Sequence, residues 1–293
     1  MKSETPKRHR FDSIDMEGCD KIFHGAYNFS KQQAEKCMKI QNKETCSDKE
    51  KKILLIYTGG TIGMEKTSNG LAPKKQFLYN YLLGHPNFCD KEFTMNEVLN
   101  NRIEKDYIVT PISIYDKRVY YRILEFDHII DSANMNLEYW KLIGKAISHN
   151  YDKYDGFVII HGTDTMSYTA SILSFQLENL NKPVILTGSQ IPLAEMRNDG
   201  IKNLIDSLTI AAIFHVPEVC IMFNGSLFRG NRTIKNDIIN YDAFESPNLR
   251  PLIEIGIYVK VNWDLILPQP TDEFNYFEVY KVPYFRILII IFQ

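Results

Sequence analysis

Two glycines and a threonine follow the first strongly apolar run of the chain. The run ILLIY (53–57) is succeeded by Thr58, Gly59, Gly60 and Thr61. Glycine lacks the Cβ atom that would keep a ligand away from the backbone, so a substrate can approach the Thr61 hydroxyl closely. Such a hydroxyl can act as a nucleophile, although a tight structural turn or a weak phosphate-binding loop would use the same residues. The P-loop pattern GxxxxGK[ST] is absent here.

A second group of polar residues combines a hydroxyl, a carboxylate and an amine. Thr163 and Asp164 lie in HGTDT, directly after the apolar run FVII (157–160). Lys235 ends the segment GNRTIK. A lysine held near a carboxylate can carry a proton to or from a hydroxyl or a water molecule, so we expect these three side chains to be in mutual reach. The alternatives are a helix N-cap for Thr163 and Asp164, and a solvated surface position for Lys235.

His161 stands at the end of the run 157–160 and is a third residue with possible chemistry. A histidine in this position more often packs against the sheet and hydrogen-bonds to the backbone than acts as a base. We therefore predict no catalytic role for it.

Four short apolar runs predict buried strands with helices between them. Asn136 is a plausible N-cap for a helix with Trp140, Ile143 and Ile147 on one face, and residues 201–212 show a second helical pattern. Strands that alternate with helices predict an α/β fold with a doubly wound, mostly parallel sheet, whose ligands bind beyond the carboxyl ends of the strands. The four runs are 53–57, 157–160, 184–187 and 219–223.

The composition favours small-molecule chemistry. The 293 residues are 44% hydrophobic and 24% charged, which is typical of a soluble globular protein. With 34 Lys+Arg against 36 Asp+Glu the net charge is −2, which favours neither nucleic acid nor an anionic membrane as a partner. The five cysteines form no CxxC pair, so we predict reduced thiols with neither a disulfide framework nor a zinc site. No HExxH motif or paired Cys/His spacing occurs, so no metal is expected, and no cofactor is expected either. The five cysteines are Cys19, Cys37, Cys46, Cys89 and Cys220.

The domain organisation expected from the sequence has three parts. Residues 1–51 are polar without a sustained period and predict a flexible extension, and residues 52–262 predict the catalytic domain. Residues 263–293 predict a linker with the remnant of a second domain. The N-terminus carries charge without the apolar segment of a signal peptide, which predicts a cytoplasmic location. The apolar run 287–292 is far shorter than the roughly 20 residues that span a bilayer, and a buried strand is expected there.

Several segments together resemble the bacterial-type L-asparaginase family. TGGTIGM (58–64) and HGTDTMSYTASILSF (161–175) are similar to its two characteristic segments. The resemblance covers about residues 53–270 and is closer to the cytoplasmic type I branch, which includes animal enzymes, than to the periplasmic branch. It continues through KPVILTGSQIPL (182–193), RNDGIKNLIDSL (197–208), LFRGNRTIKNDI (227–238) and DAFESPNLRPL (242–252).

The resemblance implies hydrolysis of L-asparagine to L-aspartate and ammonia, with glutamine as a weaker substrate. It implies that Thr61 takes the acyl group and that Thr163, Asp164 and Lys235 handle protons, while backbone N–H groups of the glycine-rich loops stabilise the oxyanion. Neither metal nor cofactor is implied. The substrate-binding residues that the resemblance implies are Asp131, Ser132, Ala133, Gly60 and Gly162.

The sequence departs from the family pattern in three places. Many members have a tyrosine in the loop after the nucleophile, where this chain has Leu71. Ala133 stands where bacterial members have a hydroxyl or amide side chain, which removes a hydrogen bond worth about 0.5–1.5 kcal/mol. The family also adds a second, smaller α/β domain that is expected to be largely missing here. Its members complete the active site with residues from the second domain of a neighbouring subunit, so this chain as given is expected to be a truncated or mispredicted product with little or no activity. A homo-oligomer is expected at full length.

Two other functions are compatible with the same residues. A truncated or impaired relative could bind asparagine or aspartate through Ser132 and Thr163 without turning it over. Some animal members are named as lysophospholipases, but the chain contains no G-x-S-x-G nucleophile elbow, which argues against that chemistry.

Overall fold

The computed structural model describes residues 50–67 and 70–278, all of which fall in one structural unit. The predicted N-terminal extension, apart from its last two residues, lies outside the described residues. The apolar run at 287–292 lies outside them as well.

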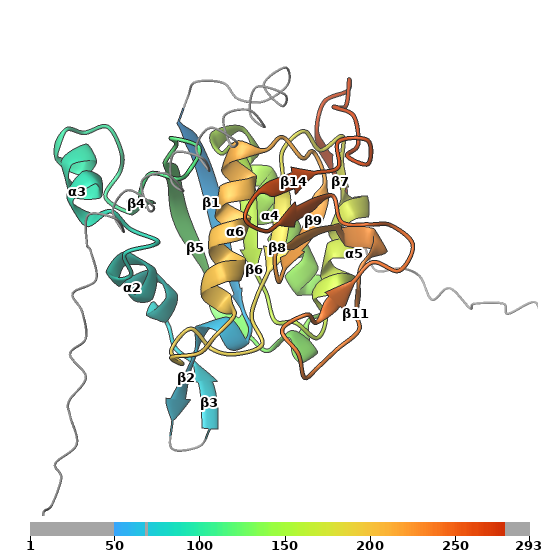
Figure 1. The fold of residues 1–293 in the computed structure, drawn as a ribbon, viewed down its shortest axis with the longest axis horizontal. Helices are drawn as coiled ribbons and strands as arrows, with labels where there is room; N and C mark the ends of the chain where they lie inside the picture. The colour runs from blue at the N-terminus through green and yellow to red at the C-terminus, as the bar shows by residue number, and fades with distance from the viewer. Residues whose placement is uncertain (1–49, 68–69, 279–293) are drawn as a thin grey trace, which may run out of the picture. The chain divides into compact units, whose positions relative to one another are not determined.

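A mixed sheet of nine strands forms the centre of the described part of the chain (Figure 1). Its five middle strands are parallel, and antiparallel strands flank them on both sides. The four predicted strands all belong to the parallel part, which confirms the predicted fold class. From one edge to the other the strands are β14 (Val259–Val261), β13 (Ile253–Ile255), β10 (Ser226–Arg229), β9 (Val219–Phe223), β8 (Val184–Thr187), β6 (Gly156–Ile160), β1 (Lys51–Gly59), β5 (Val119–Ile130) and β4 (Tyr107–Val109).

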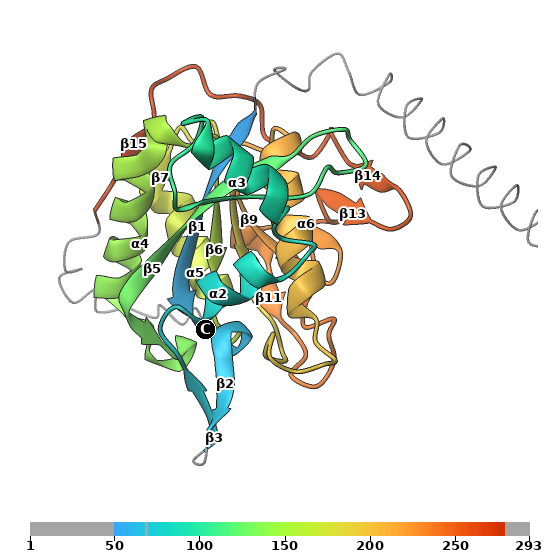
Figure 2. The same cartoon turned by 90° about the vertical axis from the view of Figure 1, so that its left-hand side faces the viewer.

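Helices cover both faces of this sheet, because its central strands are apolar on both sides. Along β1, Leu55 and Tyr57 face the core shared with α2 and α6, whereas Leu54 and Ile56 face the core shared with α4 and α5. Figure 2 shows α4 and α6 on opposite sides of the strands. The helices are α2 (Phe77–Gly84), α3 (Lys91–Leu99), α4 (Leu137–Asn150), α5 (Met166–Gln176) and α6 (Gly200–Ile213).

The two predicted helices correspond to α4 and α6. Asn136 caps α4 as expected, since its side-chain oxygen accepts hydrogen bonds from the backbone N–H groups of Glu138 at 3.0 Å and Tyr139 at 3.4 Å. In α6 the buried residues include Leu204, Leu208 and Ala211, the face that the spacing predicts. Local sequence and tertiary packing therefore agree at both elements.

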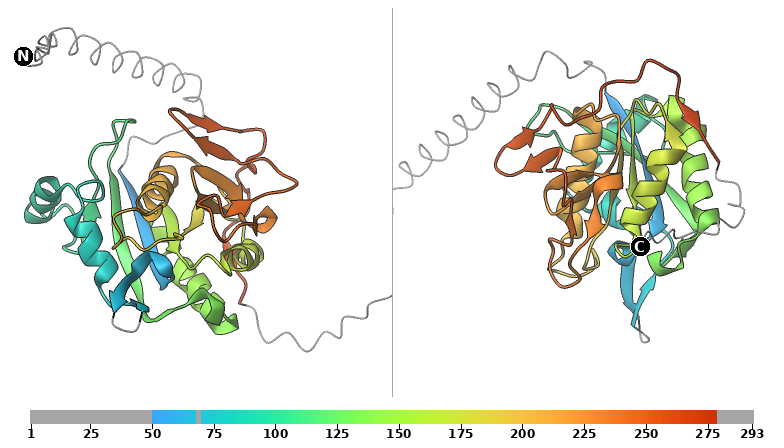
Figure 3. Two further views of the ribbon diagram at one scale, coloured as in Figure 1. Left: turned by 60° about the horizontal axis from the view of Figure 1, so that its bottom comes forward. Right: turned by 90° about the vertical axis from the view of Figure 1, so that its right-hand side faces the viewer.

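The order in which successive strands are added to the sheet reverses beside β1. The chain passes from β1 to β5 on one side, and then crosses through α4 to β6 on the other side. Ligands of open α/β sheets bind beyond the carboxyl ends of the strands at such a reversal. This end is the lower one in Figure 1, and Figure 3 (left) turns it toward the viewer. It carries the hairpin of β2 (Met64–Thr67) and β3 (Gly70–Pro73), and the ribbon of β11 (Ile234–Lys235) and β12 (Phe244–Glu245).

Residues 263–278, which the sequence predicts to form a linker, pack against the same unit. β15 (Asn275–Tyr276) pairs with β7 (Leu177–Glu178) at the end of α5. The buried carboxylate of Glu218 accepts hydrogen bonds from Arg229 at 3.0 Å and from the backbone N–H of Leu267 at 2.7 Å. A buried ion pair thus anchors the start of this segment.

None of the helices in residues 50–67 and 70–278 is both long and apolar enough to cross a membrane. The same residues contain no cluster of three or more His, Cys, Asp or Glu side chains that could hold a metal ion.

Candidate active site

Thr61 begins a short 3-10 turn, η1 (Thr61–Gly63), directly after β1. Gly60 precedes it with a φ of 90°, a conformation that only glycine adopts readily. A Cβ atom on Gly60 would lie 2.5 Å from the backbone nitrogen of Gly162. The loops after β1 and β6 are therefore in backbone contact at Gly60 and Gly162, the residues that directly precede Thr61 and Thr163. The Thr61 hydroxyl makes no hydrogen bond to another described residue and is available to a substrate.

Lys235 joins the two polar residues that follow β6. Its amine donates to the Thr163 hydroxyl at 2.7 Å and to the Asp164 carboxylate at 2.8 Å. The Lys235 side chain is only 13% exposed, whereas that of Asp164 is 62% exposed. The mutual reach expected from the sequence is therefore present. The N-cap of α5 is Thr165, which makes no side-chain capping bond, so the alternative of a cap at Thr163 and Asp164 does not describe this structure.

A small ribbon outside the main sheet places Lys235 over the β6 loop. In it, Lys235 of β11 pairs with Phe244 of β12. The preceding turn, η4 (Gly230–Arg232), packs tightly on α5, since a Cβ atom on Gly230 would lie 2.9 Å from the Val219 carbonyl oxygen and 3.0 Å from the Ala170 Cβ. The reach of Lys235 thus depends on close packing at Gly230.

The loop after β5 contributes to the site together with the loops after β1 and β6. Its short turn η2 (Ser132–Asn134) begins at Asp131, whose carboxylate accepts from the Ala133 backbone N–H at 3.1 Å. Ser132 is 2% exposed, and a Cβ atom on Gly162 would lie 2.5 Å from its hydroxyl oxygen. The structure therefore brings Gly60, Gly162 and Ser132 together, with the exposed Asp131 and Ala133 beside them.

Gln190 is a residue of this site that the sequence reasoning did not select. Its side-chain oxygen accepts a hydrogen bond from the Thr163 hydroxyl at 3.2 Å. Asp199 holds the Gln190 loop, because its carboxylate accepts from the backbone N–H groups of Gln190 at 2.9 Å and Ile191 at 3.1 Å. In the sequence, Gln190 is indicated only by its place in the polar segment GSQ after a buried strand. That pattern does not distinguish a neutral amide from other polar residues.

Leu71 lies on the hairpin that follows the η1 turn. It pairs with Lys66 across β2 and β3, and it is 47% exposed. An aliphatic side chain at this position supplies no proton acceptor.

His161 is fully buried beneath the site. Its Nδ1 lies 2.7 Å from the Gly162 carbonyl oxygen and its Nε2 lies 2.9 Å from the Thr169 hydroxyl, which also accepts from the Trp140 indole N–H. A neutral ring that donates from Nδ1 and accepts at Nε2 satisfies all these groups. Burial lowers the pKa of His161 to about 4, which keeps the ring neutral at physiological pH. This environment agrees with the structural role predicted for it.

We expect the protein to lose stability as the pH falls, because His161 must be neutral in the fold. The pKa shift from 6.5 in the unfolded chain to about 4 corresponds to about 3 kcal/mol of unfolding free energy. This contribution is complete above pH 6.5 and is lost as the pH falls toward 4. Urea unfolding at several pH values measures it. His161→Gln should be less stable at pH 7 and should show a shallower decline between pH 6.5 and 4; an equally steep decline would assign it to other groups.

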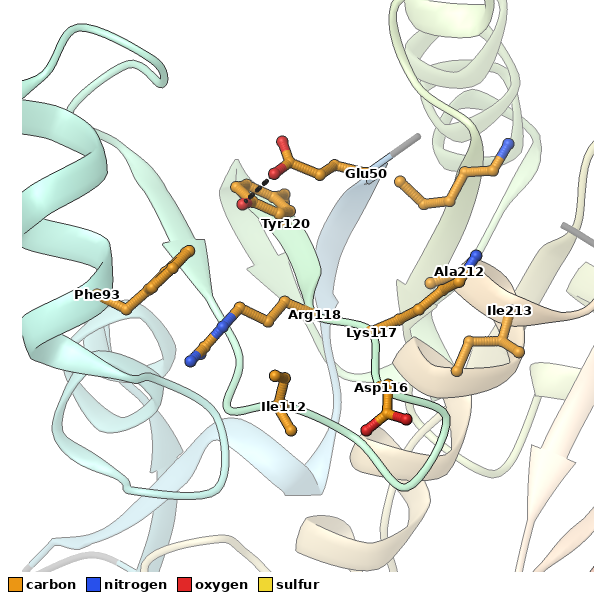
Figure 4. Close-up of a pocket in the computed structure, with 10 residues that line it drawn as sticks. Glu50, Phe93, Ile112, Asp116, Lys117, Arg118, Tyr120, Ala212 and Ile213 are labelled. Carbon is orange, nitrogen blue, oxygen red and sulfur yellow. Dashed lines mark hydrogen bonds between the residues drawn. The ribbon is translucent and has the colours of Figure 1, made fainter. Parts of the chain in front are cut away.

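A cavity of about 350 Å³ lies at the opposite edge of the sheet, near the amino ends of β1 and β5 (Figure 4). Two of its cationic groups are engaged within the protein. Arg118 donates to Asp90 at 2.8 Å and to the Thr110 carbonyl at 2.8 Å, and Lys51 pairs with Asp155 at 3.1 Å. The carboxyl edge, with Thr61 and Lys235, is therefore the better candidate for catalysis.

Comparison with known proteins identifies the family to which this region belongs. Residues 52–267 match the family described as Asparaginase, N-terminal. The chain is 44% identical over 222 residues to an L-asparaginase of Dirofilaria immitis, covering 76% of this chain and 38% of the relative. It is 43% identical over 217 residues to a 60 kDa lysophospholipase of Mus musculus, covering 74% of this chain and 38% of the relative.

A solved structure shares the fold. L-asparaginase I from Vibrio cholerae superposes with a TM-score of 0.65 at 40% sequence identity, covering 79% of this chain and 62% of that one. The chain thus spans less than two thirds of the length of these relatives. The matched region nevertheless includes all the candidate site residues, from Gly60 to Lys235. The chain therefore belongs to the asparaginase family and carries its N-terminal domain.

Proposed function

We propose that this chain is the catalytic domain of an amidohydrolase that converts L-asparagine to L-aspartate and ammonia. The observation that carries the proposal is the hydrogen-bonded group in which Lys235 bridges Thr163 and Asp164, beside the loop contact that presents Thr61. Such a group can handle a proton next to a hydroxyl nucleophile. The family membership supports the same reaction.

In the proposed mechanism the Thr61 hydroxyl oxygen bonds to the side-chain amide carbon of asparagine. The carbon–nitrogen bond breaks, and the nitrogen leaves as ammonia after taking up the proton of the hydroxyl. An aspartyl ester on Thr61 remains. Water then attacks the carbonyl carbon of this ester while the pair of Thr163 and Lys235 takes up its proton. The bond between that carbon and the Thr61 oxygen breaks, the proton passes to the Thr61 oxygen, and L-aspartate is released. Backbone N–H groups of the glycine-rich loops stabilise the oxyanion in both steps.

The substrate would be held between the loops after β1, β5 and β6. The close backbone approach of Gly60 and Gly162 leaves room for its α-carbon end, and the Ser132 hydroxyl and the Asp131 carboxylate would bind its α-carboxylate and α-amino groups. A longer amide such as glutamine would place its carbonyl carbon about one methylene away from Thr61. We therefore expect glutamine to be a weaker substrate.

The proposal includes a homo-oligomer of the full-length protein. Several large apolar side chains of the loops around the site are exposed, and clusters of exposed apolar residues mark interaction surfaces. A neighbouring subunit would cover them and exclude water from the reaction. These residues are Met196, Ile234, Ile238 and Ile239.

The proposed location is the cytoplasm. It rests on the resemblance to the type I branch and on the free, buried thiols of Cys89 and Cys220. Burial raises the pKa of both thiols, which keeps them protonated and unreactive. The proposed chemistry uses threonine and lysine side chains, and it requires no metal, cofactor, nucleic acid or membrane partner.

A substrate panel tests the proposal. The purified chain, alone and joined to the second domain of a relative, is incubated separately with L-asparagine, L-glutamine and lysophosphatidylcholine, and ammonia or fatty acid release is measured. From the joined protein we expect ammonia from asparagine, less from glutamine, and no fatty acid; from the chain alone we expect little or no ammonia. Release of fatty acid without ammonia would contradict the proposed reaction and would indicate a lysophospholipase, the activity in the name of the mouse relative. Calorimetric binding of aspartate without any turnover would instead indicate an amino-acid-binding protein.

A further inference from the structure

Tyr57 is a fully buried tyrosine whose hydroxyl has no hydrogen-bond partner among the described residues. It is the third residue before Gly60 and faces the core shared with α2 and α6. Burial raises its pKa, and the nearby charge of Glu125 raises it further, so the phenol stays protonated. An unpaired buried hydroxyl disfavours folding, and a phenylalanine of almost the same shape would avoid that cost. Packing of the core therefore does not account for this oxygen.

The Tyr57 oxygen lies directly under the turn that carries Thr61. A Cβ atom on Gly63, the last residue of η1, would lie 1.9 Å from the Tyr57 oxygen and 2.6 Å from its ring carbon Cζ. The turn is also tied to the loop after β8, since the Ile62 carbonyl accepts from the Leu193 backbone N–H at 3.0 Å. The turn is thus in contact with the Tyr57 oxygen and hydrogen-bonded to the loop after β8.

We propose that Tyr57 is a positioning residue for Thr61, with its hydroxyl oxygen setting the height of the 61–63 turn above the sheet. The inference rests on the proposed role of Thr61 as nucleophile. Removing the oxygen leaves a gap under Gly63 into which the turn can settle. A displacement of about 1 Å of a reacting atom can lower a rate by about 100-fold. Substrate contacts at Ser132 belong to another loop and should persist.

Tyr57→Phe tests this, with Tyr121→Phe as a matched control. Both tyrosines are fully buried in the same core, but the Tyr121 hydroxyl donates to the Phe88 carbonyl at 3.1 Å. We expect Tyr57→Phe to lower kcat for asparagine by about 10- to 100-fold with KM changed less than threefold. Its melting temperature should be unchanged or raised by about 2–4 °C. Tyr121→Phe should lower the melting temperature and leave kcat unchanged.

A second readout does not depend on turnover. In a protein labelled at threonine methyl groups, the Thr61 resonance is identified by its loss in Thr61→Ser. We expect Tyr57→Phe to shift it and Tyr121→Phe to leave it in place. A wild-type chain that releases no ammonia even when joined to the second domain of a relative would overturn the proposed function, while the methyl shift would still decide the positioning role. An unmoved Thr61 resonance, an unchanged kcat, or a lowered melting temperature in Tyr57→Phe would overturn the inference.

Gly63→Ala gives an independent check through a double-mutant cycle. Alone it should be strongly damaging, because its Cβ atom meets the Tyr57 oxygen at 1.9 Å. In the Tyr57→Phe background the nearest atom is Cζ at 2.6 Å, so the same change should be less damaging. Equal effects in both backgrounds would show that the oxygen does not support the turn.

Discussion

Thr61→Ala should lower the rate of ammonia release from asparagine by roughly 10⁴-fold or more, as loss of a nucleophile does in other acyl-transfer enzymes. Thr61 follows the backbone contact between Gly60 and Gly162, and its hydroxyl makes no hydrogen bond to another described residue. Steady-state ammonia assays at saturating asparagine measure the effect.

Two controls separate the loss of the nucleophile from damage to the site. Thr61→Ser keeps a hydroxyl and should retain far more activity than Thr61→Ala. Calorimetry should show that Thr61→Ala binds aspartate nearly as the wild type does, because Ser132 and Asp131 lie on a different loop. A Thr61→Ala protein within tenfold of the wild-type rate would move the nucleophile elsewhere, with Thr163 as the next candidate.

Lys235→Met should lower kcat by about 10²–10⁴-fold, the range that a positioned proton carrier contributes. The amine donates to Thr163 at 2.7 Å and to Asp164 at 2.8 Å, so its removal leaves the Thr163 hydroxyl without its cationic partner. Folding should be little affected, because the Asp164 side chain is 62% exposed and remains hydrated. We expect the melting temperature to be preserved while the rate falls, with the pH–rate profile altered.

A matched lysine provides the control for Lys235. Lys202 pairs with Asp206 at 2.7 Å on α6, and the Lys202 side chain is 53% exposed while that of Asp206 is 14% exposed. Lys202→Met should leave kcat unchanged. Equal rates for Lys235→Met and the wild type would reduce Lys235 to a surface ion pair, the alternative that the sequence left open.

The sequence predicted the strands and helices in which the local pattern coincides with the tertiary environment. β1, β6, β8 and β9 are continuous apolar runs because helices cover both of their faces. β5 escaped prediction although it is the longest strand, since Arg122 and Glu125 interrupt its apolar character. It lies nearer the sheet edge, with only the three-residue β4 beyond it, and so tolerates charge.

The candidate site was predicted through residue types rather than through geometry. Thr61, Thr163 and Asp164 follow parallel strands, so strand order alone places them at one edge. Lys235 reaches them from the β11–β12 ribbon, which no periodicity indicates because each of its strands has two residues. Gln190 was missed because an amide side chain has no special chemistry in isolation. Tyr57 was missed because it lies in the apolar run 53–57 and was interpreted only as part of a buried strand.

The central claim is that the acyl group of asparagine passes through Thr61, and trapping that intermediate tests it most directly. The protein is mixed with isotope-labelled asparagine, quenched in acid within one turnover, digested with trypsin and analysed by mass spectrometry. We predict an aspartyl ester on the peptide of residues 53–66, which contains Thr61, and its loss in Thr61→Ala. An ester on the peptide that contains Thr163, or turnover in which no ester accumulates on any residue, would contradict the account.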